Sequence, residues 1–290
     1  MRRSVPLLVT MDFEIANDHD LEDQRAALEC LKSDLGRLGI PMTIFATSDA
    51  AQRFAPELGR LALAGHEIGC HGMTHAPDED FRRMPESRTR WVIEEATRRI
   101  AIAVPRGGQP RCFRGPRMET SAVTQKVLVE TGYSADFSVC PQRLDIGSCA
   151  GGSIAWLTAP RSAYRPDSRT PYRRGSVPLI VVPLSSIGFP FISGVLYLFG
   201  LRFMKNLFRA LLAEAVRLDR PIVYLFHSYE FARWAISPQT ARVPLHQRLY
   251  CQDRALRKRW TLELLEYALS FGKTDPMTGS RLVSLVGNSA

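Results

Sequence analysis

The sequence predicts an α/β fold with a mostly parallel sheet and crossover helices, arranged as a barrel or as an open sheet. Short apolar runs alternate with longer segments of helical period, as in repeated strand–helix–strand units. The 290 residues contain no obvious linker or internal repeat, so we expect one domain over residues 1–290. The composition, 45% apolar and 23% charged, excludes a disordered chain, a collagen-like repeat and a coiled coil.

Eight short apolar runs predict strands, because β-forming residues concentrate there and turn-forming residues bound them. The predicted strands are Val5–Thr10, Met42–Ala46, Glu67–Cys70, a run near Cys112 and Phe113, Tyr133–Ser138, Leu179–Leu184, Ile222–Phe226 and Arg281–Val286. Residues 141–176 are rich in Pro, Gly, Ser and Arg and predict an irregular segment.

Six longer segments predict helices. They are Leu21–Leu38, Ala50–Ala64, Glu86–Val104, Ser121–Thr131, a helix that starts at Ser193, and Arg254–Ser270. Gly39, Gly65 and Gly132 follow three of these segments, at the position where glycine commonly ends a helix.

A long stretch without charge, from Gly175 to Leu201, stands out. Its length alone would allow a membrane span, but three prolines interrupt it. We expect a strand followed by a helix. The apolar segment 187–204 is then either ordinary core or a hydrophobic lip that contacts a membrane interface, with Lys205 and Arg209 following it.

The formal charge of +9 favours anionic partners: nucleic acid, phosphorylated ligands or an anionic membrane face. A nucleic-acid partner is not predicted, because no recognisable binding motif accompanies the arginines. The six cysteines form no C-x-x-C pair, which predicts reduced thiols. The apolar run Val5–Val9 is too short for a signal peptide, so we expect a cytoplasmic protein.

Polar residues follow the predicted strands at the edge where α/β folds gather catalytic groups. They are Asp12, Glu14, His71, His75, Arg114, Asp136 and His227. The two histidines have the i, i+4 spacing that lets two imidazoles of one helical turn share a metal ion, and the glutamate can supply a carboxylate. Two histidines, a carboxylate and water predict a catalytic zinc-type site, although the same ligands accept Co, Mn or Ni.

Five motifs, in this order, resemble those of the polysaccharide deacetylase family, also called the NodB-homology domain or carbohydrate esterase family 4. They are TMDFE at 10–14, HGMTH at 71–75, FRGPR at 113–117, GYSADFSVCP at 132–141 and LFHSYE at 225–230. The resemblance implies a distorted (β/α) barrel of about seven parallel strands. It also implies metal-dependent hydrolysis of N-acetyl or similar acyl groups on sugars.

The resemblance implies a role for each residue. Glu14, His71 and His75 would hold a divalent metal, Asp12 would be the general base, Arg114 would orient that base, His227 would be the general acid, and Asp136 would partner His227. The first motif departs from the commonest family pattern of two adjacent aspartates, because Phe13 separates Asp12 from Glu14. Asp18 and Asp20 are nearby substitutes for Glu14 as a metal ligand.

The resemblance extends to enzymes that deacylate amino sugars carried on polyprenyl phosphate at the inner membrane face. The basic charge and the apolar segment 187–204 suit such a substrate, and so do five arginines that could meet a phosphate: Arg161, Arg165, Arg169, Arg173 and Arg174. We therefore expect an N-acetyl or N-formyl amino-sugar deacylase in lipopolysaccharide or cell-envelope glycan synthesis, with peripheral membrane contact. The alternatives are a metal-dependent amidase on a small non-sugar amide and a non-catalytic sugar-binding module of the same fold.

Overall fold

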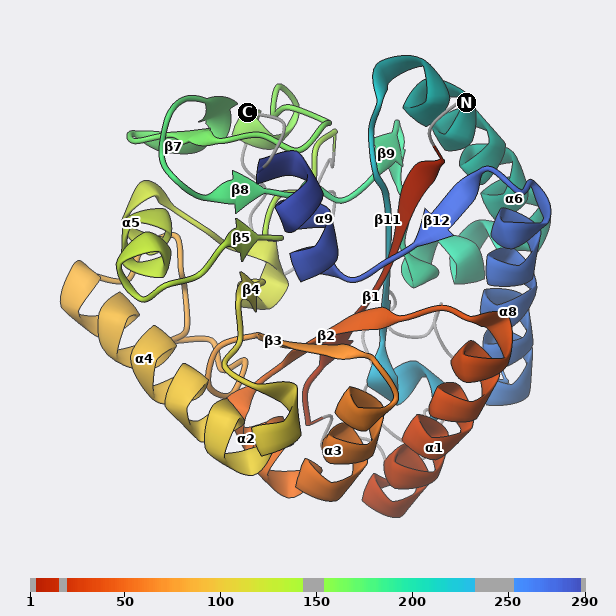
Figure 1. Ribbon diagram of the computed structural model, residues 1–290, viewed down its shortest axis with the longest axis horizontal. Coiled ribbons are helices and arrows are strands. Elements are labelled where there is room, and N and C mark those ends of the chain that lie inside the picture. The colour runs from red at the N-terminus through yellow and green to blue at the C-terminus, as the bar shows by residue number, and fades with distance from the viewer. Residues whose placement is uncertain (1–3, 16–19, 143–153, 233–252, 288–290) are drawn as a thin grey trace.

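Parallel strands curl into a half-barrel, and helices pack around its outer face in the computed structural model (Figure 1). The structure describes residues 4–15, 20–142, 154–232 and 253–287. The predicted α/β class and distorted (β/α) barrel are confirmed. The five sequence motifs that suggested this fold lie on strands of the half-barrel or just after them.

The main sheet has the strand order β11–β1–β2–β3–β4–β5–β8, with β12 beside the start of β1, and every pair in it is parallel. Its strands are β1 (Val5–Phe13), β2 (Met42–Ala46), β3 (Glu67–Cys70), β4 (Cys112–Phe113), β5 (Ala135–Asp136), β8 (Ile180–Val181), β11 (Ile222–His227) and β12 (Thr274–Pro276). Two small antiparallel pairs lie apart from it: β6 (Pro166–Asp167) with β7 (Thr170–Arg174), and β9 (Ser186–Ile187) with β10 (Phe189–Pro190).

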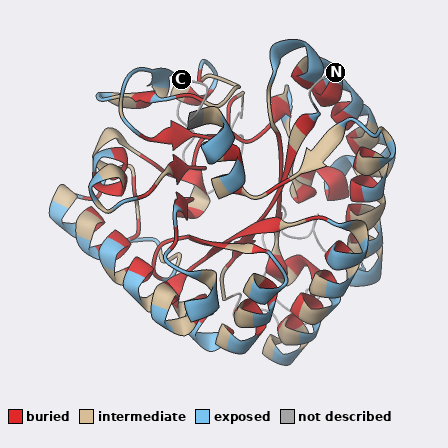
Figure 2. Ribbon diagram, viewed as in Figure 1, coloured by how far each residue is buried: buried red, intermediate tan, exposed pale blue. Residues whose placement is uncertain are grey.

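Most of the helices cover the outer face of the half-barrel (Figure 1). The α-helices are α1 (Leu21–Leu38), α2 (Ser48–Arg53), α3 (Ala55–Leu63), α4 (Glu86–Ala103), α5 (Ala122–Glu130), α6 (Ser193–Leu218), α8 (Arg254–Ser270) and α9 (Gly279–Gly287). Short 3₁₀ turns are η1 (Pro105–Gly107), η2 (Pro116–Met118), η3 (Ile154–Trp156) and η4 (Ser228–Phe231). Buried faces point to the sheet and exposed faces point outward (Figure 2).

The alternation of side chains along β1 separates core from site. Leu7, Val9 and Met11 pack in the apolar layer between the sheet and the helices, whereas Leu8 belongs to the smaller core inside the half-barrel. Because successive side chains of a strand point to opposite faces, Asp12 projects to the same inner side as Leu8. The strand therefore delivers a carboxylate to the interior at its C-terminal end.

The half-barrel nearly closes between its two edge strands. After β8, the amide of Ser185 donates to the carbonyl of Val223 at 3.4 Å, and the amide of Val223 donates to Oγ of Ser185 at 2.9 Å. Further along, the amide of Leu225 donates to the carbonyl of Phe191 at 3.3 Å. The segment between β8 and α6 therefore fills the gap beside β11 and explains the distortion of the barrel.

Three expectations about single elements were wrong. Arg281–Val286 is not a strand but part of helix α9, whose Leu282 packs into the core inside the half-barrel. A short apolar run does not distinguish the two by periodicity, and the place beside β1 is taken by β12 instead. The predicted helix Ala50–Ala64 is two helices, α2 and α3, that meet at Phe54. Within the predicted irregular segment, β6 and β7 form a hairpin.

The uncharged segment forms β8, the β9–β10 hairpin and the start of α6, as a strand followed by a helix. Its helix α6 is broken at Gly200, where the backbone adopts φ 80° and ψ 169°. Among the residues that the structure describes, none of the helices has both the length and the apolar character needed to cross a membrane.

Candidate active site

Asp12 and Glu14 lie at the C-terminal end of β1, where register places Asp12 beside His227 of β11. On its other side, Asp12 is the register partner of Phe45 in β2. Parallel neighbours in register direct their side chains to the same face. The predicted base and the predicted acid are therefore brought together by the pairing of β1 with β11.

His71 and His75 occupy the loop that follows β3, and they meet without forming a helical turn. Their ring centroids are 5.5 Å apart. His75 has a left-handed backbone, φ 67°, which is uncommon for a residue other than glycine. The buried Glu79 holds this loop by accepting hydrogen bonds from the amides of Met73, Thr74 and His75 at 2.9–3.2 Å. The expected i, i+4 pair is thus present, but in a loop braced by a carboxylate.

Ligand atoms of Glu14, His71 and His75 all lie within 4.8 Å of one another. Oε2 of Glu14 is buried, accepts no hydrogen bond from the described residues and lies 3.1 Å from Nε2 of His75. Burial lowers the pKa of His75, even though the charge of Glu14 opposes this effect, so its imidazole is kept in the neutral form that binds metals.

The orientation of His71 also suits a metal ligand. Nδ1 of His71 is 2.6 Å from the carbonyl oxygen of Arg114, which accepts hydrogen bonds only, so Nδ1 carries the proton. Nε2 then has a free lone pair, and it points toward Asp12, with 3.9 Å to Oδ2 of that carboxylate. Histidine ligands are commonly fixed in this way by a hydrogen bond from the second ring nitrogen. The donor set therefore fits a divalent metal held by Glu14, His71 and His75, as predicted, and Glu14 needs no substitute.

Of the two substitutes considered for Glu14, Asp20 has another task. Its carboxylate accepts from the amides of Glu22 and Asp23 at 2.9 and 3.1 Å, so it caps the N-terminus of α1. Asp18 lies outside the described residues.

Arg114 is completely buried and holds Asp12 in place. Its Nη1 donates to Oδ1 of Asp12 at 2.7 Å and its Nη2 donates to Oγ1 of Thr10 at 3.0 Å. The guanidinium also lies over the ring of Phe45, 4.3 Å from the centroid, which provides an apolar support. The predicted orienting role of Arg114 agrees with this geometry.

The environment of Asp12 keeps the carboxylate ionised. Burial by itself would raise the pKa of Asp12, but the charges of Arg114 and His227, with the hydrogen bond from Arg114, outweigh burial and lower it. Because Arg114 occupies Oδ1, the second oxygen, Oδ2, is the one turned toward His71. This is the oxygen available to accept a proton.

His227 pairs with Glu230, not with Asp136 as predicted. Nδ1 of His227 is 3.0 Å from Oε1 of Glu230, which lies three residues later in η4. Burial tends to lower the pKa of His227, but the hydrogen bond to Glu230 and the charges of Glu230, Asp12 and Glu14 raise it to about 9. His227 is therefore protonated at neutral pH and can donate a proton.

Glu230 was missed as a site residue, although it lies inside the motif LFHSYE. Its buried carboxylate also accepts hydrogen bonds from two side chains of α6: Ser193 Oγ to Oε1 at 2.5 Å and Tyr197 OH to Oε2 at 2.9 Å. The signal for it was the i, i+3 spacing from His227, since residues three apart eclipse each other in a 3₁₀ turn.

Asp136 braces the loop after Arg114. Its Oδ1 accepts from the amide and hydroxyl of Ser138 at 2.9 and 2.5 Å, and Oδ2 accepts from Thr120 and Gln125 at 2.8 and 3.3 Å. Oγ of Ser138 in turn accepts from the amide of Gly115 at 2.8 Å. Burial raises the pKa of the Asp136 carboxyl, although these hydrogen bonds partly offset the effect. Both oxygens are thus engaged away from His227.

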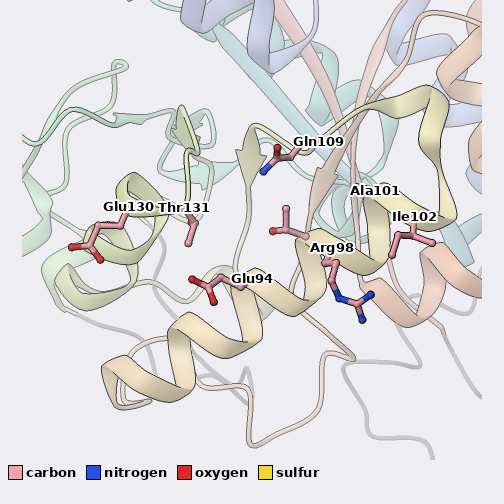
Figure 3. Close-up of a pocket in the computed structure, with 8 residues that line it drawn as sticks. Glu94, Arg98, Ala101, Ile102, Gln109, Glu130 and Thr131 are labelled. Atoms are coloured by element: carbon pink, nitrogen blue, oxygen red, sulfur yellow. The ribbon is translucent and has the colours of Figure 1, made fainter.

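A surface hollow elsewhere is separate from this cluster (Figure 3). It lies between α4, α5 and the loop after η1. None of the seven predicted site residues lines it. The lining residues are Glu94, Thr97, Arg98, Ala101, Ile102, Gln109, Glu130 and Thr131. The candidate active site is therefore the cluster at the strand ends.

The fold and site together define a class: an α/β half-barrel with two histidines and a carboxylate suited to a metal, beside a buried carboxylate–arginine pair and a protonated histidine. Comparison with known proteins makes the class specific. A family model described as Polysaccharide deacetylase matches residues 22–135, the part that contains His71, His75 and Arg114. None of the curated proteins matches the sequence at a significant level.

Solved structures share the fold across nearly the whole chain. A protein from Mycobacterium smegmatis that was assigned as a polysaccharide deacetylase has a TM-score of 0.67 at 15% identity, over 100% of this chain and 93% of that one. Puue allantoinase has a TM-score of 0.59 at 17% identity, over 98% of this chain and 90% of that one. A protein from Pseudomonas aeruginosa PAO1, assigned in the same way as the first, has a TM-score of 0.59 at 16% identity, over 96% and 89%. The predicted resemblance to the polysaccharide deacetylase family is confirmed over residues 22–135, and the fold is shared over nearly the whole chain.

Proposed function

We propose that this protein is a metal-dependent hydrolase that removes an N-acetyl or N-formyl group from an amino sugar carried on a membrane lipid. The observation that supports it best is the arrangement of three groups at one edge of the sheet. These are the ligand set of Glu14 and two histidines, the Asp12–Arg114 pair, and the His227–Glu230 pair. Amide hydrolysis needs an activated water, a proton acceptor and a proton donor, and these residues can serve all three needs.

Glu14, His71 and His75 would hold the metal. When bound, a divalent ion polarises the acyl oxygen and lowers the pKa of a water molecule. Asp12 accepts the proton of the attacking water at Oδ2, because Oδ1 is engaged by Arg114. Arg114 keeps Asp12 ionised and fixes its orientation, so the proton acceptor is in place before the substrate arrives.

His227 supplies the proton that the leaving nitrogen requires. An amine leaves poorly unless it is protonated, and His227 is raised to a pKa of about 9, so it enters the reaction charged. Glu230 holds Nδ1 of His227, which leaves Nε2 as the donor to the leaving group. The ring of Tyr229 lies 5.1 Å from that of His227, nearly parallel, and restricts its rotation.

The lipid carrier is the finer part of the proposal. It is supported by the basic composition and by the exposed apolar residues near α6. The location at the inner face of the cytoplasmic membrane and a role in envelope glycan synthesis stay predictions, as does zinc as the metal.

The test measures release of acetate or formate from a lipid-linked N-acyl amino sugar and from its water-soluble counterpart, with and without a chelator. Chelator-sensitive release from the lipid-linked form alone would support the whole proposal. Equal release from both would keep the deacylase and remove the lipid carrier. If metal binds and neither substrate reacts, the sugar deacylase is refuted, and a panel of small cyclic and linear amides then separates an amidase from a non-catalytic sugar-binding module.

A further inference from the structure

Three phenylalanines form a cluster at the surface, which we term the aromatic lip: exposed Phe189 and Phe199, with half-buried Phe203 between them and the core. Their ring centroids are 5.0–5.3 Å apart. Phe189 keeps 42% and Phe199 46% of its surface exposed, and the neighbouring Leu198 keeps 50%. Contiguous exposed apolar residues of this size usually mark an interaction site, because exposing them to water is unfavourable.

The backbone presents the lip through two glycines in the left-handed region. Gly188, φ 68°, turns the β9–β10 hairpin just before Phe189. Gly200, φ 80°, breaks α6 between Phe199 and Phe203. A side chain at either position would be strained, so the two turns that bring the rings together depend on glycine.

The lip lies at the edge of the sheet that carries the candidate active site. The helical turn before Gly200 places Ser193 and Tyr197 on its buried side, where both bond Glu230, the partner of His227. Its exposed side carries Leu198 and Phe199. One short segment therefore supports the proton donor on one side and forms the lip on the other.

Positive charge borders the lip and negative charge does not occur within its segment. The sequence has no charged residue from Gly175 to Leu201. Exposed Arg202 then follows directly, with exposed Arg209 two turns further along α6. Aromatic and aliphatic side chains beside basic residues are the combination that binds the interface of an anionic bilayer.

We propose that the aromatic lip docks on an anionic lipid bilayer, inserting its rings among the acyl chains while Arg202 contacts the headgroups. A second copy of the chain is a weaker match. Half-exposed side chains of this number and size present roughly 300–400 Å² of apolar surface, whereas a stable dimer interface covers about 800 Å² of each partner. The inference goes beyond the proposed hydrolysis, since binding to a bilayer is measured without any substrate.

The test is flotation of the full chain with vesicles of phosphatidylcholine alone or with added phosphatidylglycerol. The wild type is expected to float with the anionic vesicles and much less with neutral ones. The variant Phe189→Ser/Phe199→Ser is expected to bind about tenfold more weakly or worse, because each ring loses the burial of its exposed half. The matched control is Trp91→Ser, which removes an aromatic residue of 47% exposure from α4 and should leave binding unchanged.

The charge is tested by Arg202→Glu, which should weaken binding to anionic vesicles about fivefold or more, while the same change at exposed Arg106 should not. Binding should also fall as salt increases. Absence of flotation with anionic vesicles, or equal flotation of the lip variant, would overturn the proposal. So would sedimentation showing lip-dependent dimers without lipid. Failure of the deacylase assay with intact vesicle binding would refute the proposed function alone.

Discussion

Glu230→Gln isolates the role of the carboxylate behind His227. The change keeps the size of the side chain and removes the charge that, with the hydrogen bond from His227, contributes most to raising the pKa of His227 from the ordinary 6.5 to about 9; the charges of Asp12 and Glu14 contribute less. A raised pKa means that the proton-donating form is present below pH 9 and is lost as pH rises through that value. Removing the charge moves this loss toward pH 6.5 or lower.

The shift predicts a defect that depends on pH. At pH 8 a group of pKa 9 is about 91% protonated and one of pKa 6.5 about 3%, so kcat/KM should fall about 30-fold. At pH 6 the two fractions are about 100% and 76%, so the loss should be less than about twofold. The assay is kcat/KM for acyl release from pH 5.5 to 10, with the same metal in both proteins.

Two variants complete this experiment. Glu230→Asp keeps the charge, so its kcat/KM should fall at a higher pH than that of the glutamine variant. Glu94→Gln removes an exposed carboxylate from α4 and should leave the profile unchanged. If the basic limb of Glu230→Gln coincides with that of the wild type, Glu230 does not control the proton donor and the reasoning is wrong. A uniform loss at every pH would indicate a purely structural role.

The other predictions concern the base and the metal loop. Arg114→Ala should lower the free energy of unfolding in urea by about 3–5 kcal/mol, because it leaves the buried Asp12 unpaired. Asp12→Asn should reduce acyl release by about 10²–10⁴-fold, and full activity would exclude Asp12 as the base. Because the pKa of Asp12 is lowered from 3.8, ionised Asp12 stabilises the fold above that pH. The contribution is lost as pH falls, so the stability gap between wild type and Asp12→Asn should narrow in acid. His71→Ala should abolish tight zinc binding in calorimetry, whereas Glu79→Gln should weaken it about 10- to 100-fold through the loop.

The sequence could predict which residues group at the site, because these residues lie at the ends of strands. Asp12, Glu14, His71, Arg114 and His227 each end or follow a parallel strand, and a parallel sheet brings such positions to one edge. Their grouping therefore needs only the order of strands and the side-chain alternation. The same logic predicted the fold class, since strand–helix alternation dominates most of the chain.

Elements at the C-terminal end were harder because short apolar runs are ambiguous. Leu282 and Val286 are four residues apart, and both pack on the core inside the half-barrel. A spacing of four places two residues on the same face of a helix or of a strand, so the spacing does not distinguish the two. The strand β12 contains Pro276 and only half-buried residues, so neither apolar alternation nor β propensity marked it. Its place beside β1 follows from the tertiary fold alone.

His227 pairs with Glu230 and not with the predicted Asp136, and this pairing could not be predicted from the order of the motifs. Both carboxylates are buried near strand ends, and a motif identifies each position without saying where its oxygens point. Thr120, Gln125 and Ser138 surround Asp136 and satisfy both of its oxygens, so it has none to offer His227. Glu230 lies within one 3₁₀ turn of that histidine and receives further hydrogen bonds from α6. The proposed proton donor is therefore supported by the same helix that carries the aromatic lip, which makes α6 the element to mutate when site and surface are compared.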